Sequence, residues 1–256
     1  MRRTHLLLAL ASLTACDGEV EDTDVFVPDF NVRPGVEQVT VLDAEPGAVL
    51  TLYNSSDEAL LAITANERGQ AHFAYIPSDF TTLAAGERFT LSEGITLQAG
   101  SDYTIVDDSG RTSGPFDVLD VDDVEPLTPY EDQVLTGIHS SPLTGDDGDP
   151  LDAFQFIETR DGTLLSAMVR FPDPLLYGEG PYPTVIEYSG YSPSRPDRPD
   201  SGSFIANALG FATVGVNMRG TGCSGGVFDV FNKAQQADGY DIVEVVARQE
   251  WVLHNH

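Results

Sequence analysis

Tyr182-Pro-Thr-Val-Ile-Glu-Tyr188 opens the stretch of sequence that decides the fold of this chain. This apolar, β-type run is followed by a turn-rich loop, Ser189-Gly-Tyr-Ser-Pro-Ser194. A short helical pattern at 203–210 then begins with Ser203 as a capping residue and ends at Gly210. The stretch closes with a second apolar run and a glycine-rich loop, Phe211-Ala-Thr-Val-Gly-Val-Asn-Met218 and Arg219-Gly-Thr-Gly-Cys-Ser-Gly-Gly226.

The order strand, loop, helix, strand predicts a βαβ unit with a parallel sheet. Nearly continuous apolar strands are typical of a sheet that is covered on both faces. In the helical segment, the apolar face is formed by Phe204, Ile205, Ala208 and Leu209. Ligands of such sheets bind at the carboxyl ends of the strands, and both turn-rich loops follow those ends. The architecture therefore predicts a site there.

Five blocks of sequence, in a fixed order, carry a resemblance to a known family. They are Arg160-Asp-Gly-Thr-Leu-Leu-Ser166, Pro183-Thr-Val-Ile-Glu-Tyr-Ser-Gly-Tyr191, Asn217-Met-Arg-Gly-Thr-Gly-Cys-Ser-Gly225, Asp238-Gly-Tyr-Asp241 and Arg248-Gln-Glu-Trp251. In this order and spacing they resemble the cocaine-esterase and Xaa-Pro dipeptidyl-peptidase family of serine α/β-hydrolases. The resemblance extends from about 154 to 251, which is less than half of the chain.

The resemblance implies acyl transfer on small ester, amide or peptide substrates, without a cofactor or a metal ion. Tyr191 matches the tyrosine whose hydroxyl donates to the oxyanion in this family. Arg219, Gly220 and Gly222 match the loop that borders the active site. Asn217 stands where many relatives have Asp, and we assign it no catalytic role.

The resemblance also implies a Gly-x-Ser-x-Gly nucleophile elbow, with an acid and a base, after the helix that ends near Trp251. We expect all three groups beyond His256, so the chain as given is expected to be inactive, as a fragment or as a natural truncation. The alternative function is a non-catalytic cell-surface binding module that keeps a relic hydrolase half. Nothing in the sequence fixes the oligomeric state.

The charge of the chain argues against nucleic acid as a partner. It has 41 acidic and 13 basic residues, for a net charge of −28. Binding to phosphates requires clustered Lys and Arg, and the only lysine is Lys233. An acidic, extracytoplasmic surface is the simpler interpretation.

The N-terminus predicts export. Two arginines precede a short apolar run, too short to span a bilayer, and Leu13-Thr-Ala-Cys16 matches the lipobox of bacterial lipoproteins. We therefore predict a signal peptide at 1–15, a lipidated Cys16, a membrane partner through that lipid, and a place in the bacterial cell envelope. An ordinary cleaved signal with an unmodified Cys16 is the alternative. The acidic segment 16–35 is predicted to be a solvated tether.

The segment 36–121 predicts a β-sandwich that resembles bacterial immunoglobulin-like modules. Short strands alternate with turn signals every eight to twelve residues. The candidate strands lie at 36–42, 48–53, 59–63, 71–75, 89–91, 103–106 and 114–118. His72 lies within one of them, and we interpret it as a cross-strand residue rather than a ligand.

The segment 122–152 is rich in Asp, Pro and Gly and is predicted to be a solvated linker. Its aspartates do not have the spacing of an EF-hand loop, and we predict no metal site. The remaining segment, 153–256, is predicted to be the N-terminal part of an α/β-hydrolase domain. It begins with a hairpin and ends with a helix at about 237–253, whose apolar stripe is formed by Tyr240, Ile242, Val243, Val246, Ala247 and Trp251.

Two further side chains in the glycine-rich loop carry chemistry elsewhere in proteins. With Cys16 lipidated, Cys223 is the only remaining thiol. It is interpreted as a buried residue or as the partner of a cysteine outside this sequence, and not as a nucleophile. Ser224 has no histidine nearby in the sequence and is interpreted as structural.

Overall fold

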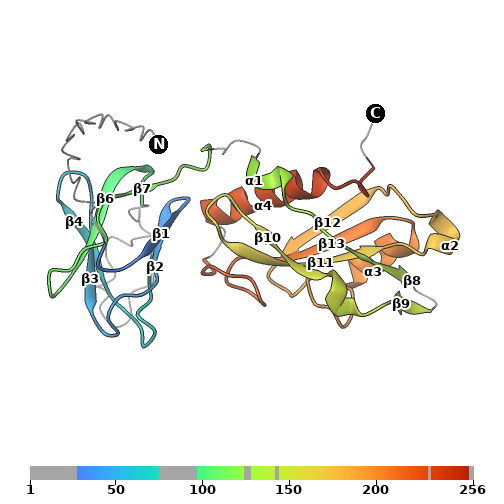
Figure 1. Ribbon diagram of the computed structural model, residues 1–256, viewed down its shortest axis with the longest axis horizontal. Coiled ribbons are helices and arrows are strands. Elements are labelled where there is room, and N and C mark those ends of the chain that lie inside the picture. Colours follow the sequence, from blue (N-terminus) through green and yellow to red (C-terminus); the bar gives the residue numbers. More distant parts are fainter. Residues whose placement is uncertain (1–27, 75–96, 124–127, 142–143, 230–231, 254–256) are drawn as a thin grey trace, which may run out of the picture.

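The computed structural model describes residues 28–74, 97–123, 128–141, 144–229 and 232–253. The chain is mostly β-sheet, with few helices, and the described residues form an N-terminal part (28–123) and a C-terminal part (128–253) that lie side by side (Figure 1). The predictions for 1–27, with Cys16, and for the strand at 89–91 fall outside the described residues. In the described part, no helix is long and apolar enough to cross a membrane.

The N-terminal part consists of two antiparallel sheets around one core. The first has the order β1-β2-β5 and the second the order β4-β3-β6-β7. Their bounds are β1 Val32–Gly35, β2 Gln38–Val41, β3 Val49–Tyr53, β4 Ala59–Thr64, β5 Ala71–Phe73, β6 Gly100–Asp107 and β7 Phe116–Val118. Val39 and Phe73 from the first sheet pack in the same cluster as Leu50 and Ile105 from the second. Burial of these alternating side chains holds the two sheets together.

The structured region begins before 36, where the predicted tether was expected to end. Phe30 is buried in the core, and β1 occupies the last part of the tether. Pro34 concealed this strand in the sequence, yet it is tolerated because β1 is an outer strand of its sheet. Asn31 holds the start of β1 in place, since its side chain donates a hydrogen bond to the Asp43 carboxylate at 2.7 Å.

The C-terminal part contains a six-stranded mixed sheet. Along its main path the order is β12-β13-β11-β8-β9, and β10 pairs with β11. The strands are β8 Ile138–Ser141, β9 Gly145–Asp147, β10 Phe154–Glu158, β11 Leu164–Phe171, β12 Thr184–Ser189 and β13 Ala212–Asn217. The helices are α1 Thr128–Glu131, the 3-10 helix Pro150–Ala153, α2 Pro174–Tyr177, α3 Ser201–Ala208 and α4 Lys233–Ala247. β12 pairs with β13 in parallel and β10 with β11 as a hairpin, as the sequence predicts.

The segment 122–152 contains more structure than a solvated linker. It holds α1, the β8–β9 hairpin and the 3-10 helix. Tyr130 and Ile138 are buried, and the Ser140 hydroxyl donates a hydrogen bond of 2.6 Å to Asp146. The sequence did not indicate these elements, because apolar residues are sparse in this acidic stretch. A few isolated buried side chains hold the elements in place, and they form no periodic apolar face.

The α3 helix presents a different face to the sheet than its apolar residues indicated. Ser203 and Asn207 are buried, whereas Phe204, Ile205 and Leu209 are exposed. The Asn207 side chain donates hydrogen bonds to the carbonyl oxygens of Arg170 and Phe211, and this polar anchoring sets the rotation of the helix.

The buried face of α4 is also offset from the predicted stripe. Ile242 and Val245 are fully buried in the core with β11 and β13, but Tyr240 and Val243 are exposed. The buried face includes two aspartates that ion pairs neutralise, so its apolar pattern is interrupted in the sequence. Trp251 is partly buried against the same core, in agreement with its interpretation as a packing residue.

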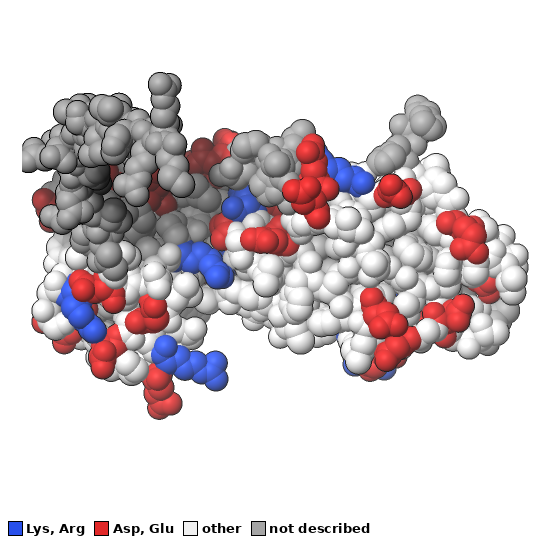
Figure 2. Space-filling model, in the orientation of Figure 1, with Lys and Arg blue, Asp and Glu red and all other residues white. Residues whose placement is uncertain are grey.

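The two parts contact each other at the start of α4. Val36 from the N-terminal part is buried against Ala234 and Ala237. Lys233 forms an ion pair with Glu37 across the same contact. On the face shown in Figure 2, acidic groups are spread over both parts and basic groups are fewer.

The offset of the α4 face yields a direct test. Ile242→Ala should lower the free energy of unfolding by about 2–5 kcal/mol, because it opens a cavity in a fully buried site. Val243→Ala, at the neighbouring position that is 50% exposed, should change it little. Urea unfolding followed by tryptophan fluorescence checks both variants. Equal effects of the two substitutions would contradict the observed rotation of α4.

Candidate active site

The loop after β12 carries Tyr191 at the carboxyl end of a parallel strand. The strand ends at Ser189, whose hydroxyl oxygen accepts a hydrogen bond from the backbone N–H of Tyr191 at 3.3 Å. Ser192 adopts a positive φ of 65°, which turns the chain back toward the sheet. Tyr191 is 89% exposed, so its phenol is free to meet a substrate. The prediction that it donates to an oxyanion stays a prediction.

Asn217, at the end of β13, holds this loop in place. Its side-chain oxygen accepts hydrogen bonds from the Ser194 backbone N–H at 3.1 Å and from the Ser194 hydroxyl at 2.7 Å. Its amide nitrogen donates to the Thr221 hydroxyl at 3.3 Å. Asn217 is fully buried, and it therefore ties the loop after β12 to the loop after β13.

Three serine hydroxyls extend this connection to β11. The Ser166 hydroxyl lies 2.9 Å from that of Ser194 and 3.3 Å from that of Ser224. Ser224 also accepts from the Ser166 backbone N–H at 2.9 Å and donates to the Asn217 carbonyl oxygen at 2.8 Å. Because its oxygen is used in this way, Ser224 acts as a structural group.

Gly220 and Gly222 are required by the backbone of the loop after β13. Both have positive φ angles, 71° and 56°. A Cβ at Gly220 would lie 2.0 Å from the Phe228 nitrogen, and one at Gly222 would lie 2.4 Å from the Asn217 side chain. The glycines thus allow the loop to fold tightly over Asn217. In the same loop, Cys223 is free and exposed rather than buried.

Arg219 differs most from its expected position. Its side chain is buried and forms ion pairs with Asp161 at 3.0 Å and with Asp238, whose Oδ2 lies 2.7 Å from Nε. Among the described residues, no hydrogen bond or ring contact joins Arg219 to Tyr191. The backbone of Arg219 belongs to the loop, but its guanidinium lies inside the protein, where it connects three motif blocks.

The electrostatics of this cluster follow from burial and pairing. Burial acts to lower the pKa of Arg219, but Asp238 and Asp161 outweigh it and raise the pKa of the guanidinium. Burial acts to raise the pKa of Asp161, and the charge of Arg219 holds it below its usual range. The pKa of Tyr188 is raised by burial and by Asp238, so its hydroxyl stays protonated and donates to Asp238 at 3.2 Å.

A second buried ion pair lies beside the first. Arg160 Nη2 is 2.8 Å from Asp241 Oδ1, and the Tyr130 hydroxyl donates to the same oxygen at 2.7 Å. Arg160 also donates to the carbonyl oxygens of Val121 and Asp123, at the end of the N-terminal part. In the sequence, these acidic and basic residues stand out only as members of the family blocks. A signal that could have found the clusters is that three of the five blocks carry charged residues of complementary sign: Arg160 and Asp161, Arg219, and Asp238 and Asp241.

Among the described residues, no group of three or more His, Cys, Asp or Glu side chains could hold a metal ion. Asp146 belongs to the acidic cluster in 122–152. Its Oδ2 lies 3.7 Å from Nε of Arg170, and its Oδ1 accepts a hydrogen bond from the Ser140 hydroxyl.

Comparison with known proteins gives a partial match. The family model described as X-Pro dipeptidyl-peptidase (S15 family) matches residues 161–254, less than half of the chain. No curated protein sequence matches. The match includes most of the motif blocks and supports a hydrolase of the peptidase kind.

Two solved structures share limited similarity with the chain. One is ferulic acid-bound Est1E from Butyrivibrio proteoclasticus, with 19% identity, a TM-score of 0.30, and coverage of 39% of this chain and 39% of that chain. The other is a thermostable esterase, with 11% identity, a TM-score of 0.24, and coverage of 85% of this chain and 66% of that one. The chain thus spans less than two thirds of either structure.

The Arg219 cluster makes a prediction for stability. Arg219→Gln should lower the free energy of unfolding by about 3–5 kcal/mol, because it leaves two carboxylates buried without their cation. Arg195→Gln, which removes a solvent-exposed pair with Asp197, is the matched control and should have little effect. Urea unfolding measures both. A stability of Arg219→Gln equal to that of the control would refute the structural role of the cluster.

Proposed function

We propose that this chain is the N-terminal part of an exported serine hydrolase that transfers acyl groups from ester or amide bonds, with Xaa-Pro dipeptidyl-peptidase-like chemistry. The family match at 161–254 supports the hydrolase kind. The finer parts of the proposal are an immunoglobulin-like module, an α/β-hydrolase domain and a lipid anchor at Cys16. All three rest on the sequence pattern. The immunoglobulin-like module is also supported by the two sheets of the N-terminal part.

One observation carries the proposal: the chain that leaves α4 returns to the free edge of β12. Tyr182 forms a parallel bridge with Val252. The Tyr182 N–H donates to the Trp251 carbonyl oxygen at 2.8 Å, and the Leu253 N–H donates to the Tyr182 carbonyl oxygen at 2.7 Å. A strand that continued in this direction would run parallel to β12, in the position expected for the next strand of a doubly wound sheet.

The end of such a strand would lie beside the Tyr191 loop, because β12 and its new neighbour would end at the same edge of the sheet. We propose that this strand leads into the nucleophile elbow. The elbow is a sharp turn that presents a serine at the carboxyl end of a central strand. Tyr191, exposed and at that edge, would then face the nucleophile.

The proposed reaction is ordinary acyl transfer. A base takes the proton of the serine hydroxyl as its oxygen attacks the carbonyl carbon, and the carbonyl oxygen becomes negatively charged. The Tyr191 phenol would donate to this oxyanion. The tetrahedral intermediate then collapses to an acyl-serine as the leaving alcohol or amine takes up the proton. Water, deprotonated by the same base, attacks the acyl carbon in turn, and the serine leaves with that proton as the acid is released. In this scheme the Asn217 and serine hydrogen bonds hold the donor loop still, so that the donor is oriented before the reaction.

The role of Tyr191 is tested by Tyr191→Phe in a version of the protein that extends beyond His256. Loss of one oxyanion donor should lower kcat for p-nitrophenyl acetate about 100-fold, which corresponds to about 3 kcal/mol. The matched control is Tyr240→Phe, at an exposed tyrosine on α4, and should keep wild-type turnover. An unchanged kcat in Tyr191→Phe would remove Tyr191 from the mechanism.

The anchor is tested by metabolic labelling with palmitate in a bacterial host. The wild-type protein should incorporate label and should partition into the membrane fraction, since acyl chains supply the anchoring energy. Cys16→Ala should lose both properties, whereas Cys223→Ala should keep them. Labelling that persists in Cys16→Ala would contradict the proposed anchor.

A further inference from the structure

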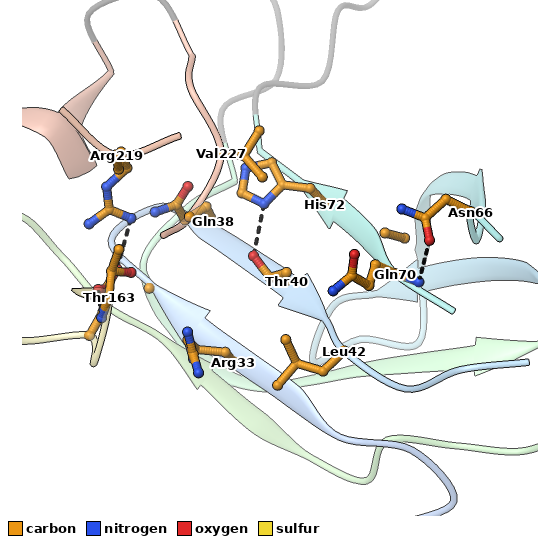
Figure 3. A pocket seen from close by; sticks show the side chains of 14 residues that line it. Arg33, Gln38, Thr40, Leu42, Asn66, Gln70, His72, Thr163, Arg219 and Val227 are labelled. Carbon is orange, nitrogen blue, oxygen red and sulfur yellow. Dashed lines mark hydrogen bonds and ion pairs between the residues drawn. The ribbon is translucent and has the colours of Figure 1, made fainter. Parts of the chain in front are cut away.

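The two parts of the protein enclose a cavity of about 350 Å³ at their junction. It lies apart from the Tyr191 loop, which contributes no lining residue among those described. The N-terminal part supplies the floor, and the segments 161–163 and 219–227 supply a wall (Figure 3). Cavities of this size at the junction of two folded units are typical of small-molecule sites.

The floor is the outer face of the sheet β1-β2-β5. Along β2, Val39 and Val41 point into the core, so the alternating residues Gln38 and Thr40 face the other way and line the cavity. His72 of β5 is the direct cross-strand neighbour of Thr40, and its Nδ1 lies 2.9 Å from the Thr40 hydroxyl (Figure 3).

Among the described residues, two polar atoms of the lining side chains have no hydrogen-bond partner. Gln38 is only 4% exposed, and its side-chain oxygen is buried without a hydrogen bond. The Nε2 atom of His72 is likewise buried and unpaired. A buried polar atom without a partner destabilises the folded state, so native structures keep few of them without a reason. Both atoms are shielded as the side chains stand, but their residues line the same cavity, so a rotation of each side chain toward it would let a bound ligand complete their hydrogen bonds.

The charges of the lining define the ligand further. Burial, reinforced by the charge of Arg219, lowers the pKa of His72 to about 4, so the ring is neutral at pH 7. Asp161 and Arg219 also line the cavity, but they are already paired with each other. Arg33 is the remaining charged lining residue. It is exposed, and no ion pair is formed by it among the described residues.

We propose that this junction cavity binds a sugar acid, a small polyhydroxylated carboxylate of hexuronate size. The carboxylate pairs with Arg33, whose planar guanidinium matches it in a bidentate arrangement. Hydroxyl groups suit the floor because each one both donates and accepts, and so serves the Gln38 oxygen and the neutral His72 ring alike. Leu42, Ala71 and Val227 supply apolar contact for the C–H groups of the ring. This site is independent of the proposed acyl transfer.

The test is calorimetric titration of the full chain with three probes: D-glucuronate, D-glucose and acetate. Glucuronate should bind more tightly than either control, because glucose lacks the carboxylate and acetate lacks the hydroxyls. Equal binding of glucose would overturn the role of Arg33. Equal binding of acetate would overturn the role of the polar floor. No binding of glucuronate would overturn the site.

Three variants separate binding from folding. Arg33→Gln, on the surface, should weaken glucuronate binding about tenfold or more. Gln38→Met should weaken it similarly while the melting temperature is unchanged or raised, since the variant removes an unpaired buried oxygen. Arg68→Gln changes an exposed arginine outside the lining and should bind like wild type. Wild-type affinity in Arg33→Gln, or equal losses in Arg33→Gln and Arg68→Gln, would refute the proposal.

Discussion

The buried guanidinium of Arg219, held between Asp161 and Asp238, is the interaction on which the C-terminal part depends. These three residues come from the β10–β11 turn, the loop after β13 and α4, so one side chain fixes three segments that are distant in sequence. The cation and its hydrogen bonds offset the desolvation of the two carboxylates, fully at Asp161 and in part at Asp238, where burial outweighs Arg219 and raises the pKa. The Arg160–Asp241 pair repeats this arrangement beside it and reaches the end of the N-terminal part through Val121.

The candidate site follows from this framework. With α4 and the loop after β13 fixed, Asn217 can tie that loop to the one after β12, and the hydroxyls of Ser166, Ser194 and Ser224 complete the connection. The loop is therefore held while the Tyr191 side chain stays exposed. The same ion-pair cluster forms part of the wall of the junction cavity, since Arg219 and Asp161 both line it. The Arg219 ion pairs thus support both the Tyr191 loop and the wall of the junction cavity.

The sequence predicts those features that rest on local pattern. The parallel pairing of 184–189 with 212–217, the hairpin before it and the glycine-rich loop all follow from apolar runs and turn residues. The orientation of α3 and α4 does not, because Asn207 and Asp238 are buried by polar contacts that no hydrophobic period records. Pro34 hid β1 for a different reason, because proline is unusual within a strand. The Arg219 cluster and the junction cavity are formed by residues far apart in sequence, and only the folded chain brings these residues together.

The central claim is that Arg219 and Asp238 stabilise the fold as a pair, and a double-mutant cycle measures this directly. Arg219→Met, Asp238→Leu and the double variant are compared with wild type by urea unfolding. Arg219→Met leaves Asp161 and Asp238 buried without their cation, whereas Asp238→Leu leaves Arg219 paired with Asp161 alone. Since the double variant no longer buries Asp238 without Arg219, it should be more stable than the sum of the single effects predicts, by about 1–3 kcal/mol. Additive effects, within about 0.5 kcal/mol, would show that the two residues act independently and would contradict the claim.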